Sequence, residues 1–250
     1  MQNSGTNNVP AAIEFTVGAN IELASGISID MTAAANNLTI KNGAGTLTLD
    51  GAVTFDVTTG KTLSITEAVD NSGNDLTVQG AGNTTISGVV SGTGQVIKNG
   101  AGILTLSAAS NTFSGNLTVS AGTVSLNNTT APLAAGVISM SGGILLLNQA
   151  INAANWNRTI TFTGGATIQS AAASEIDADI TNGGILLTIT GTENLTISSI
   201  IGSGAGGVTV NMTALADVVT LSGANTYTGA TTVDIVLITL FYDEIFKVIN

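Results

Sequence analysis

Apolar residues alternate with small polar residues in short runs along the whole chain. Such runs recur from Leu47-Thr48-Leu49 to Val208-Thr209-Val210, and segments rich in Gly, Asn and Ser separate them. An alternation of period two places every second side chain on one face, which is the pattern of a half-buried strand. Gly, Asn and Ser supply the positive φ angles and the local hydrogen bonds of turns. The pattern predicts an all-β chain whose one amphipathic helical stripe lies at the C-terminus.

Internal repeats decide between the architectures that short strands allow. Residues 41–49 reappear almost unchanged as residues 98–106, and residues 106–115 resemble residues 221–229 when one gap is allowed. Self-similar segments of short strands and small corners are typical of stacked coils. We therefore predict a parallel β-solenoid rather than a sandwich or a barrel. With about 22–25 residues in a coil, the chain makes roughly ten coils, which form a rod about 50 Å long.

Composition narrows the functions open to this chain. The 250 residues include no His and no Cys, which excludes a Ser-His-Asp triad, an imidazole–zinc site, a thiol nucleophile and a disulfide framework. Five basic residues and a net charge of −11 disfavour binding to nucleic acid and to anionic lipid. The longest apolar runs fall far short of the roughly 20 residues of a membrane-spanning helix. We expect no cofactor, no nucleic-acid partner and no direct membrane insertion.

Two short patterns have a chemical interpretation as well as a structural one. Glu175, Asp177 and Asp179 alternate along one predicted strand, and their carboxylates are a candidate calcium site. The alternative, which we prefer, is a solvated face opposite the apolar residues between them. Residues 202–207 match the Gly-rich dinucleotide-binding pattern, which requires a helix to follow. A strand-like segment follows instead, so we interpret these glycines as a corner and predict no metal and no catalytic residue.

Residues 98–126 contain a basic residue, a Gly-x-Gly, a Leu-Thr-Leu strand and an Asn-Thr-aromatic-Ser-Gly segment, and residues 219–234 repeat the later part. In this order and spacing they resemble the passenger-associated transport repeat of bacterial autotransporters, whereas residues 41–49 match only its opening. The Asn, Thr and Gly bias is most similar to rickettsial surface-antigen passengers. The residues expected to carry the repeat's structure are Gly100, Gly102, Asn111, Phe113, Gly115 and Gly122, and in the second copy Gly223, Asn225, Tyr227 and Gly229.

This resemblance implies a right-handed parallel β-helix that type V secretion carries to the cell surface through a C-terminal outer-membrane barrel. It also implies that the repeats serve export and folding of the passenger. We therefore predict a non-enzymatic passenger fragment that forms a surface-displayed or secreted stalk, with adhesion to a host-surface ligand as its role. The translocator barrel is missing from this chain, and its first eight residues lack the basic and apolar regions of a signal peptide.

Two other functions remain open from the sequence. One is a polysaccharide-active β-helix enzyme, a lyase or a glycosidase, which needs a base beside acidic groups. Arg158 is the single Arg of the chain, and its neighbours Asn155, Trp156 and Asn157 include no carboxylate. The other is a decayed, truncated gene product without a function of its own.

The C-terminal segment breaks the repeat pattern. We expect residues 1–235 to form one solenoid fragment, after which the repeat predicts Gly-Thr-Leu. Residues 236–250 instead form an aromatic-rich stretch without Gly. The preferred hypothesis is a frameshift, since deletion of one nucleotide from a Gly-Thr-Leu coding run yields Val-Leu. The alternative is a cap in which Phe241, Ile245 and Val248 or Ile249 share one face of a short helix.

Overall fold

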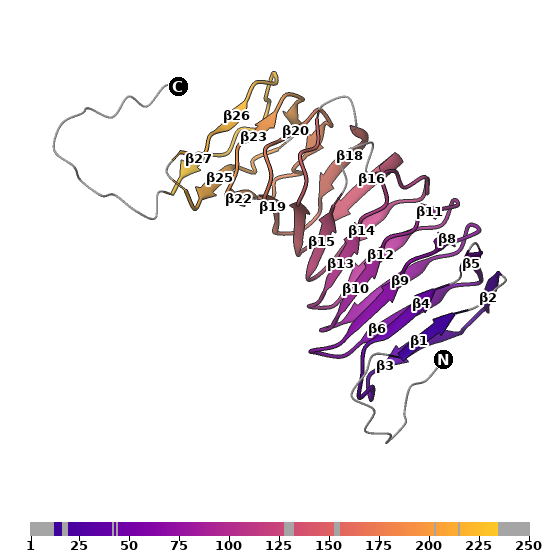
Figure 1. Cartoon of the computed structure of the whole chain (residues 1–250). Helices are drawn as coiled ribbons and strands as arrows, with labels where there is room; N and C mark the ends of the chain where they lie inside the picture. Colours follow the sequence, from indigo (N-terminus) through magenta and orange to yellow (C-terminus); the bar gives the residue numbers. More distant parts are fainter. Residues whose placement is uncertain are drawn as a thin grey trace.

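The computed structural model describes residues 13–16, 20–41, 43, 45–127, 133–152, 156–202, 204–214 and 216–234. Within these ranges the regular secondary structure consists of β-strands alone, and the strands wind into a solenoid (Figure 1). The strand pairs among the described residues are parallel; for example, Leu63 pairs with Leu38 of one coil and with Thr84 of the next. The predicted all-β parallel solenoid is confirmed. No described segment is a helix that could cross a membrane.

Each coil passes through three faces, which we call A, B and C. Face A is a sheet of nine described strands. These strands are β3 (Ser28–Met31), β6 (Val53–Val57), β9 (Leu76–Gly80), β12 (Val96–Asn99), β14 (Leu117–Val119), β16 (Leu133–Met140), β18 (Trp156–Phe162), β21 (Ile180–Thr181) and β24 (Ile201–Gly202).

Face B follows face A in each coil and is a sheet of eleven described strands. Its strands are β1 (Ile13–Thr16), β4 (Leu38–Lys41), β7 (Thr62–Ile65), β10 (Asn83–Ile86), β13 (Ile103–Leu106), β15 (Thr123–Leu126), β17 (Ile144–Leu147), β19 (Ala166–Ser170), β22 (Leu187–Gly191), β25 (Val208–Met212) and β27 (Thr231–Val233). The solenoid has about nine turns, close to the roughly ten that the sequence predicts.

Face C completes the coil and is interrupted in the middle of the rod. It consists of a four-stranded and a three-stranded sheet among the described residues. Its strands are β2 (Ile21–Ala24), β5 (Thr46–Asp50), β8 (Ala68–Asp70), β11 (Val90–Ser91), β20 (Ser174–Ile176), β23 (Leu195–Ile197) and β26 (Val219–Leu221).

The core is a set of inward rows of aliphatic side chains that run along the axis. Because strands in register repeat one coil apart, each inward residue contacts its equivalents before and after it. One inward row of face B contains Leu38, Leu63, Thr84, Leu104, Val124, Leu145, Ile168, Ile189 and Val210. Thr84 is the single polar residue among these described residues.

Candidate functional site

The asparagine of each repeat copy binds the backbone of the preceding coil. Asn111 is 1% exposed, and its Oδ1 accepts a hydrogen bond from the backbone N–H of Val90 at 3.0 Å. In the second copy, Asn225 Oδ1 accepts from the N–H of Ile201 at 2.9 Å. Val90 and Ile201 each begin a strand, so both asparagines satisfy a donor where a ladder starts. The two copies share this contact, although it falls on face C in one and on face A in the other.

Equivalent strands of different repeat copies therefore lie on different faces of the solenoid. The Leu-Thr-Leu of residues 104–106 belongs to β13 on face B. Its sequence counterparts at residues 47–49 and 219–221 belong to β5 and β26, both on face C. Each face needs the same alternation followed by a small corner, so one sequence pattern can form any of the three. Similarity between repeats therefore predicts the local contacts but not the face.

The repeat glycines stand where successive coils come closest. At every one of them, an added Cβ atom would lie within 2.5 Å of a backbone oxygen of another coil, too close for a side chain. For Gly102 this distance to Gly82 O is 1.7 Å. Gly122 has in addition a φ of +67°, which disfavours side chains. This crowding applies to Gly100, Gly102, Gly115, Gly122, Gly223 and Gly229.

The aromatic residues of the two copies differ in burial. Phe113 is fully buried, in the place where the interrupted face C would pass. Tyr227 is only partly buried; it packs against the core and its hydroxyl forms a 2.7 Å hydrogen bond with Thr231 Oγ1. Tyr227 belongs to the last described coil, whereas Phe113 has described coils on both sides.

Arg158, the candidate base of the enzyme alternative, is buried and bound to the first repeat. Its Nη1 donates to Gly115 O at 2.7 Å and its Nη2 to Phe113 O at 2.5 Å. Burial lowers the pKa of its guanidinium to about 10. Trp156, on the same strand, donates from its indole N–H to Glu175 O at 2.7 Å. Both side chains therefore act as anchors between coils, and the guanidinium is withdrawn from solvent.

Lys98, the basic residue that opens the first repeat, points into the core. It is 1% exposed and lies in an inward row between Val78 and Val119. Its Nζ donates to Gly100 O at 2.5 Å, and burial lowers its pKa to about 8. Lys41, its counterpart in the partial repeat, is exposed at the end of β4. The alternation that begins at Val96 is the sequence signal that places Lys98 on the inward side.

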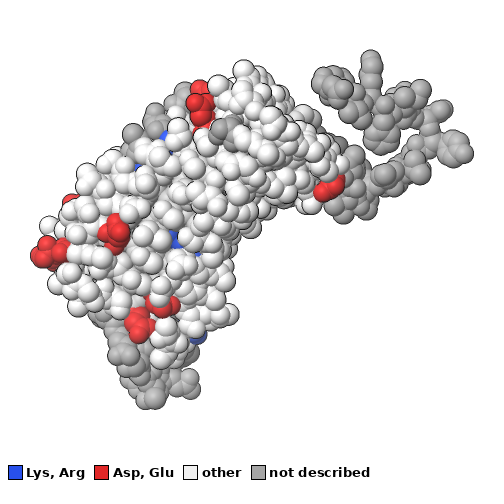
Figure 2. Space-filling model, turned by 180° about the vertical axis from the view of Figure 1, so that it is seen from behind, with Lys and Arg blue, Asp and Glu red and all other residues white. Residues whose placement is uncertain are grey.

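The three carboxylates of the calcium candidate lie along the outside of face C and the following corner. Glu175, Asp177 and Asp179 alternate with buried residues, as the sequence predicts. Asp177 accepts a 3.5 Å hydrogen bond from Ser198 Oγ, and Asp179 accepts one of 3.3 Å from the N–H of Ile200. In the described part of the chain, no three acidic side chains gather closely enough to hold a metal ion. Figure 2 shows acidic groups scattered over a surface that is otherwise almost uncharged.

The Gly-rich corner and the C-terminal coil complete the candidate sites. Residues 202–207 lead from β24 into strand β25, so the helix that a dinucleotide site requires does not follow.

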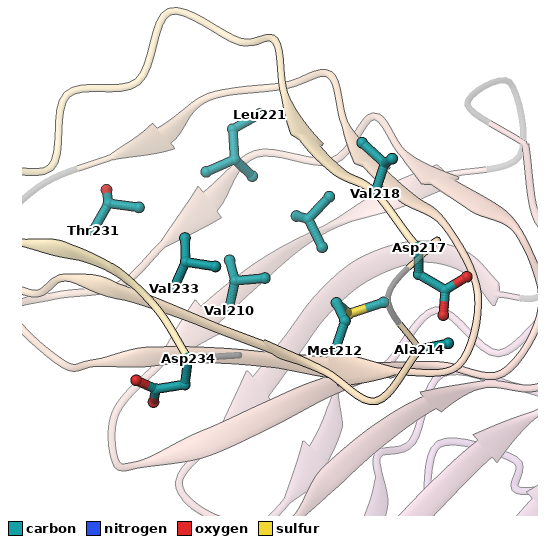
Figure 3. Close-up of a pocket in the computed structure, with 10 residues that line it drawn as sticks. Val210, Met212, Ala214, Asp217, Val218, Leu221, Thr231, Val233 and Asp234 are labelled. Atoms are coloured by element: carbon teal, nitrogen blue, oxygen red, sulfur yellow. The ribbon is translucent and has the colours of Figure 1, made fainter. Parts of the chain in front are cut away.

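Beyond that corner, the last described coil encloses an apolar pocket of about 360 Å³ between β25, β26 and β27. Figure 3 shows Val210, Met212, Leu221 and Val233 around this space, with Asp217 at one side. Residues 236–250, which we predict to be an aberrant tail or a cap, lie outside the described residues.

The repeated Asn and Gly residues lie at the contacts between successive coils of the parallel β-solenoid. The family described as passenger-associated-transport-repeat matches residues 40–63, 96–126 and 216–234. The predicted copies at 98–126 and 219–234 are thus confirmed, and the partial copy extends beyond residue 49.

The chain is also similar to the "Adhesin BmaC autotransporter" of Brucella suis biovar 1 (strain 1330), with 40% identity over 148 residues. The alignment covers 56% of this chain but 4% of that adhesin, so the chain spans a small part of the relative's length. No solved structure matches the chain. The chain thus contains three segments that match this repeat, and it is similar over part of its length to an autotransporter adhesin.

Proposed function

We propose that this chain is a section of a surface-displayed or secreted passenger, in which it extends a non-enzymatic stalk and supports adhesion to a host surface. The adhesin relative supports the adhesive role. In the parent protein, a C-terminal outer-membrane barrel would export the passenger.

The observation that carries this proposal is the pair of contacts from Asn111 to Val90 and from Asn225 to Ile201. Each contact fastens a coil to the coil before it, and the unpaired edge of a parallel sheet is a template for the next strand. Such nearest-neighbour stability allows coils to be added one at a time. The repeats would therefore help the passenger to fold as it emerges from the cell.

A catalytic role receives less support from the same structure. Arg158 donates to two backbone carbonyls and is 2% exposed, so it is poorly placed to act on a polysaccharide. The carboxylates on the described surface are dispersed, whereas glycoside hydrolysis uses a pair that flanks the scissile bond.

The experiment is display of the chain on a bacterium, between a signal peptide and an autotransporter translocator barrel. We expect protease-accessible chain on the cell surface and more binding to host cells than with the barrel alone. The paired substitutions Asn111→Ala and Asn225→Ala should lower the displayed amount several-fold, because two strand-start N–H groups lose their acceptor. Asn152→Ala, at an exposed position, is the matched control.

Two results would contradict the proposal. Host-cell binding equal to that of the barrel alone, with the chain displayed, would remove the adhesive role. Turnover of pectin, glucan or peptidoglycan that Arg158→Ala abolishes would show that the passenger is an enzyme.

A further inference from the structure

One outward row of face A lacks a side chain at a single strand. The row runs in register from Ser28 on β3 to Gly202 on β24, and its other members in the described strands are Ser, Thr or Ile residues. Gly202 lies between Thr181 of the preceding coil and Thr226 of the next one. A hollow of about 240 Å³ opens here on the outside of the solenoid, with described coils on both sides of it along the axis.

The backbone does not require a glycine at this position. The φ of Gly202 lies outside the left-handed region, and an added Cβ atom would meet two side-chain atoms, Thr226 Oγ1 at 3.3 Å and Ile200 Cγ2 at 3.4 Å. At the repeat glycines, by contrast, the Cβ atom would collide with a backbone oxygen. The stacking of coils therefore does not explain Gly202, whereas the close approach of a ligand is a common reason for a glycine within a strand.

The side chains around the hollow are a carboxylate, two hydroxyls and an apolar group. Asp179 lies at the corner before β21, and its Oδ1 accepts a hydrogen bond from the N–H of Ile200 at 3.3 Å, which orients the carboxylate. No described residue forms a hydrogen bond with Asp179 Oδ2 or with the hydroxyls of Thr181 and Thr226. The side chain of Ile200 is 41% exposed and lines one wall.

We propose that this hollow binds one ring of a neutral sugar. The hydroxyl groups of such a ring donate to the carboxylate of Asp179, and the two Thr hydroxyls both donate and accept. Ile200 removes a C–H face of the ring from water. The hollow is smaller than the roughly 300–1,000 Å³ of pockets for drug-sized ligands, so one ring fills it. This inference rests on the proposed adhesive function, for which it names a ligand class.

The charge of the site favours a neutral ligand over an ionic one. The described residues that line the hollow include Asp179 and no basic residue, and the net charge of the chain is −11. Acidic sugars and phosphate groups are therefore repelled. A cation would gain little, because a single exposed carboxylate attracts it only weakly in water. A sugar ring uses the carboxylate, both hydroxyls and the apolar wall together.

Titration of the full-length chain with the methyl glycosides of glucose, galactose and mannose tests the site. The NMR signals of the methyl groups of Thr181, Ile200 and Thr226 report binding. We expect at least one glycoside to shift these signals with a Kd in the millimolar range, because a single ring makes few contacts.

Three variants locate the binding. Gly202→Thr gives β24 the residue type of its neighbours in the row, and it should weaken binding about tenfold or more because its side chain occupies the space of the ring. Asp179→Asn keeps the shape of the site and should weaken binding several-fold, because an amide oxygen is a weaker acceptor than a carboxylate. Gly165→Thr, at a corner with open space around its Cβ position, is the matched control and should bind like the unsubstituted chain. Thermal melting shows that each variant is folded.

Two outcomes would overturn the proposal. The first is that none of the three glycosides binds; if butylamine then shifts the same methyl signals and salt weakens its binding, the occupant is a cation. The second is binding that Gly202→Thr and Asp179→Asn leave unchanged, or that Gly165→Thr weakens equally.

Host-cell binding by the displayed chain separates this inference from the proposed function. Adhesion without sugar binding would keep the adhesive role and remove this site from it. Sugar binding by a displayed chain that does not adhere would remove the adhesive role alone.

Discussion

The guanidinium carbon of Arg158 lies 4.4 Å from the ring centroid of Phe113, and its Nη2 donates a hydrogen bond to the carbonyl of the same residue. The two residues are 45 positions apart. Arg158 is on β18, which pairs with β16, and β16 pairs with β14, the strand that follows Phe113. The contact thus reaches across the intervening coil. It joins two coils that are not neighbours, in the part of the rod where face C is interrupted.

Replacement of Arg158 should weaken the middle of the rod. Arg158→Ala leaves the carbonyls of Phe113 and Gly115 without these donors and removes the contact with the aromatic ring, so we expect a loss of about 3 kcal/mol. Arg158→Lys should recover only part of this, because an ammonium group lacks the planar fork of donors. Urea unfolding measures the loss, and Lys41→Ala at an exposed position is the control. Equal unfolding midpoints for Arg158→Ala and the unsubstituted chain would contradict this role.

Lys98 should make stability depend on alkaline pH. Its pKa in the folded chain is about 8 and its ordinary value is 10.5, so between these values the unfolded chain binds more protons. The free energy of unfolding contributed by Lys98 therefore rises as pH increases from 8 to 10.5. Lys98→Met has no such contribution, and its stability relative to the unsubstituted chain should fall by about 2 kcal/mol over this window. Denaturant titrations at several pH values provide the measurement.

Lys41→Met is the matched control for that experiment, since Lys41 occupies the same sequence position in an exposed setting. A difference between Lys98→Met and the unsubstituted chain that stays constant with pH would contradict the prediction for Lys98.

Thr84 offers a stabilising substitution. Its Oγ1 is buried in an inward row of face B, and no described residue forms a hydrogen bond with it. Thr84→Val has nearly the same shape without the hydroxyl, so we expect a gain of about 1 kcal/mol, or a few degrees in Tm. Thr85→Val, the next residue on the outward side, should stay within about 0.5 kcal/mol of the unsubstituted chain. A calorimetric scan distinguishes the two, and a destabilised Thr84→Val would mean that the hydroxyl has a partner.

Gly102 tests the close approach of coils. The Cβ of Gly102→Ala would lie 1.7 Å from Gly82 O, so the backbone must shift, and we expect a loss of about 3 kcal/mol or more. Gly165 is a corner glycine with open space around its Cβ position and no left-handed φ, so Gly165→Ala should be nearly neutral. Thermal melting followed by far-UV circular dichroism compares them. Similar Tm values for both variants would show that the coils can separate at no cost.

Several site residues are predictable from the sequence because their roles are local. Asn111 follows Leu106 by five residues and Asn225 follows Leu221 by four, and each makes the same contact with the preceding coil. The contact between Arg158 and Phe113 has no such signal in the sequence, because it depends on the number of residues in the intervening coil. Lys98 is intermediate: alternation places it inward, while the rule that charge is exposed predicts the opposite.

The sequence by itself determined that this protein is a parallel solenoid with repeated Asn and Gly corners. Period-two alternation and crowded small corners are properties of each segment, and they hold wherever the segment lies. Only the tertiary structure decided which face each repeat copy occupies and which coils Arg158 joins. Coil lengths vary with their corners, so the phase between repeat and face shifts along the rod.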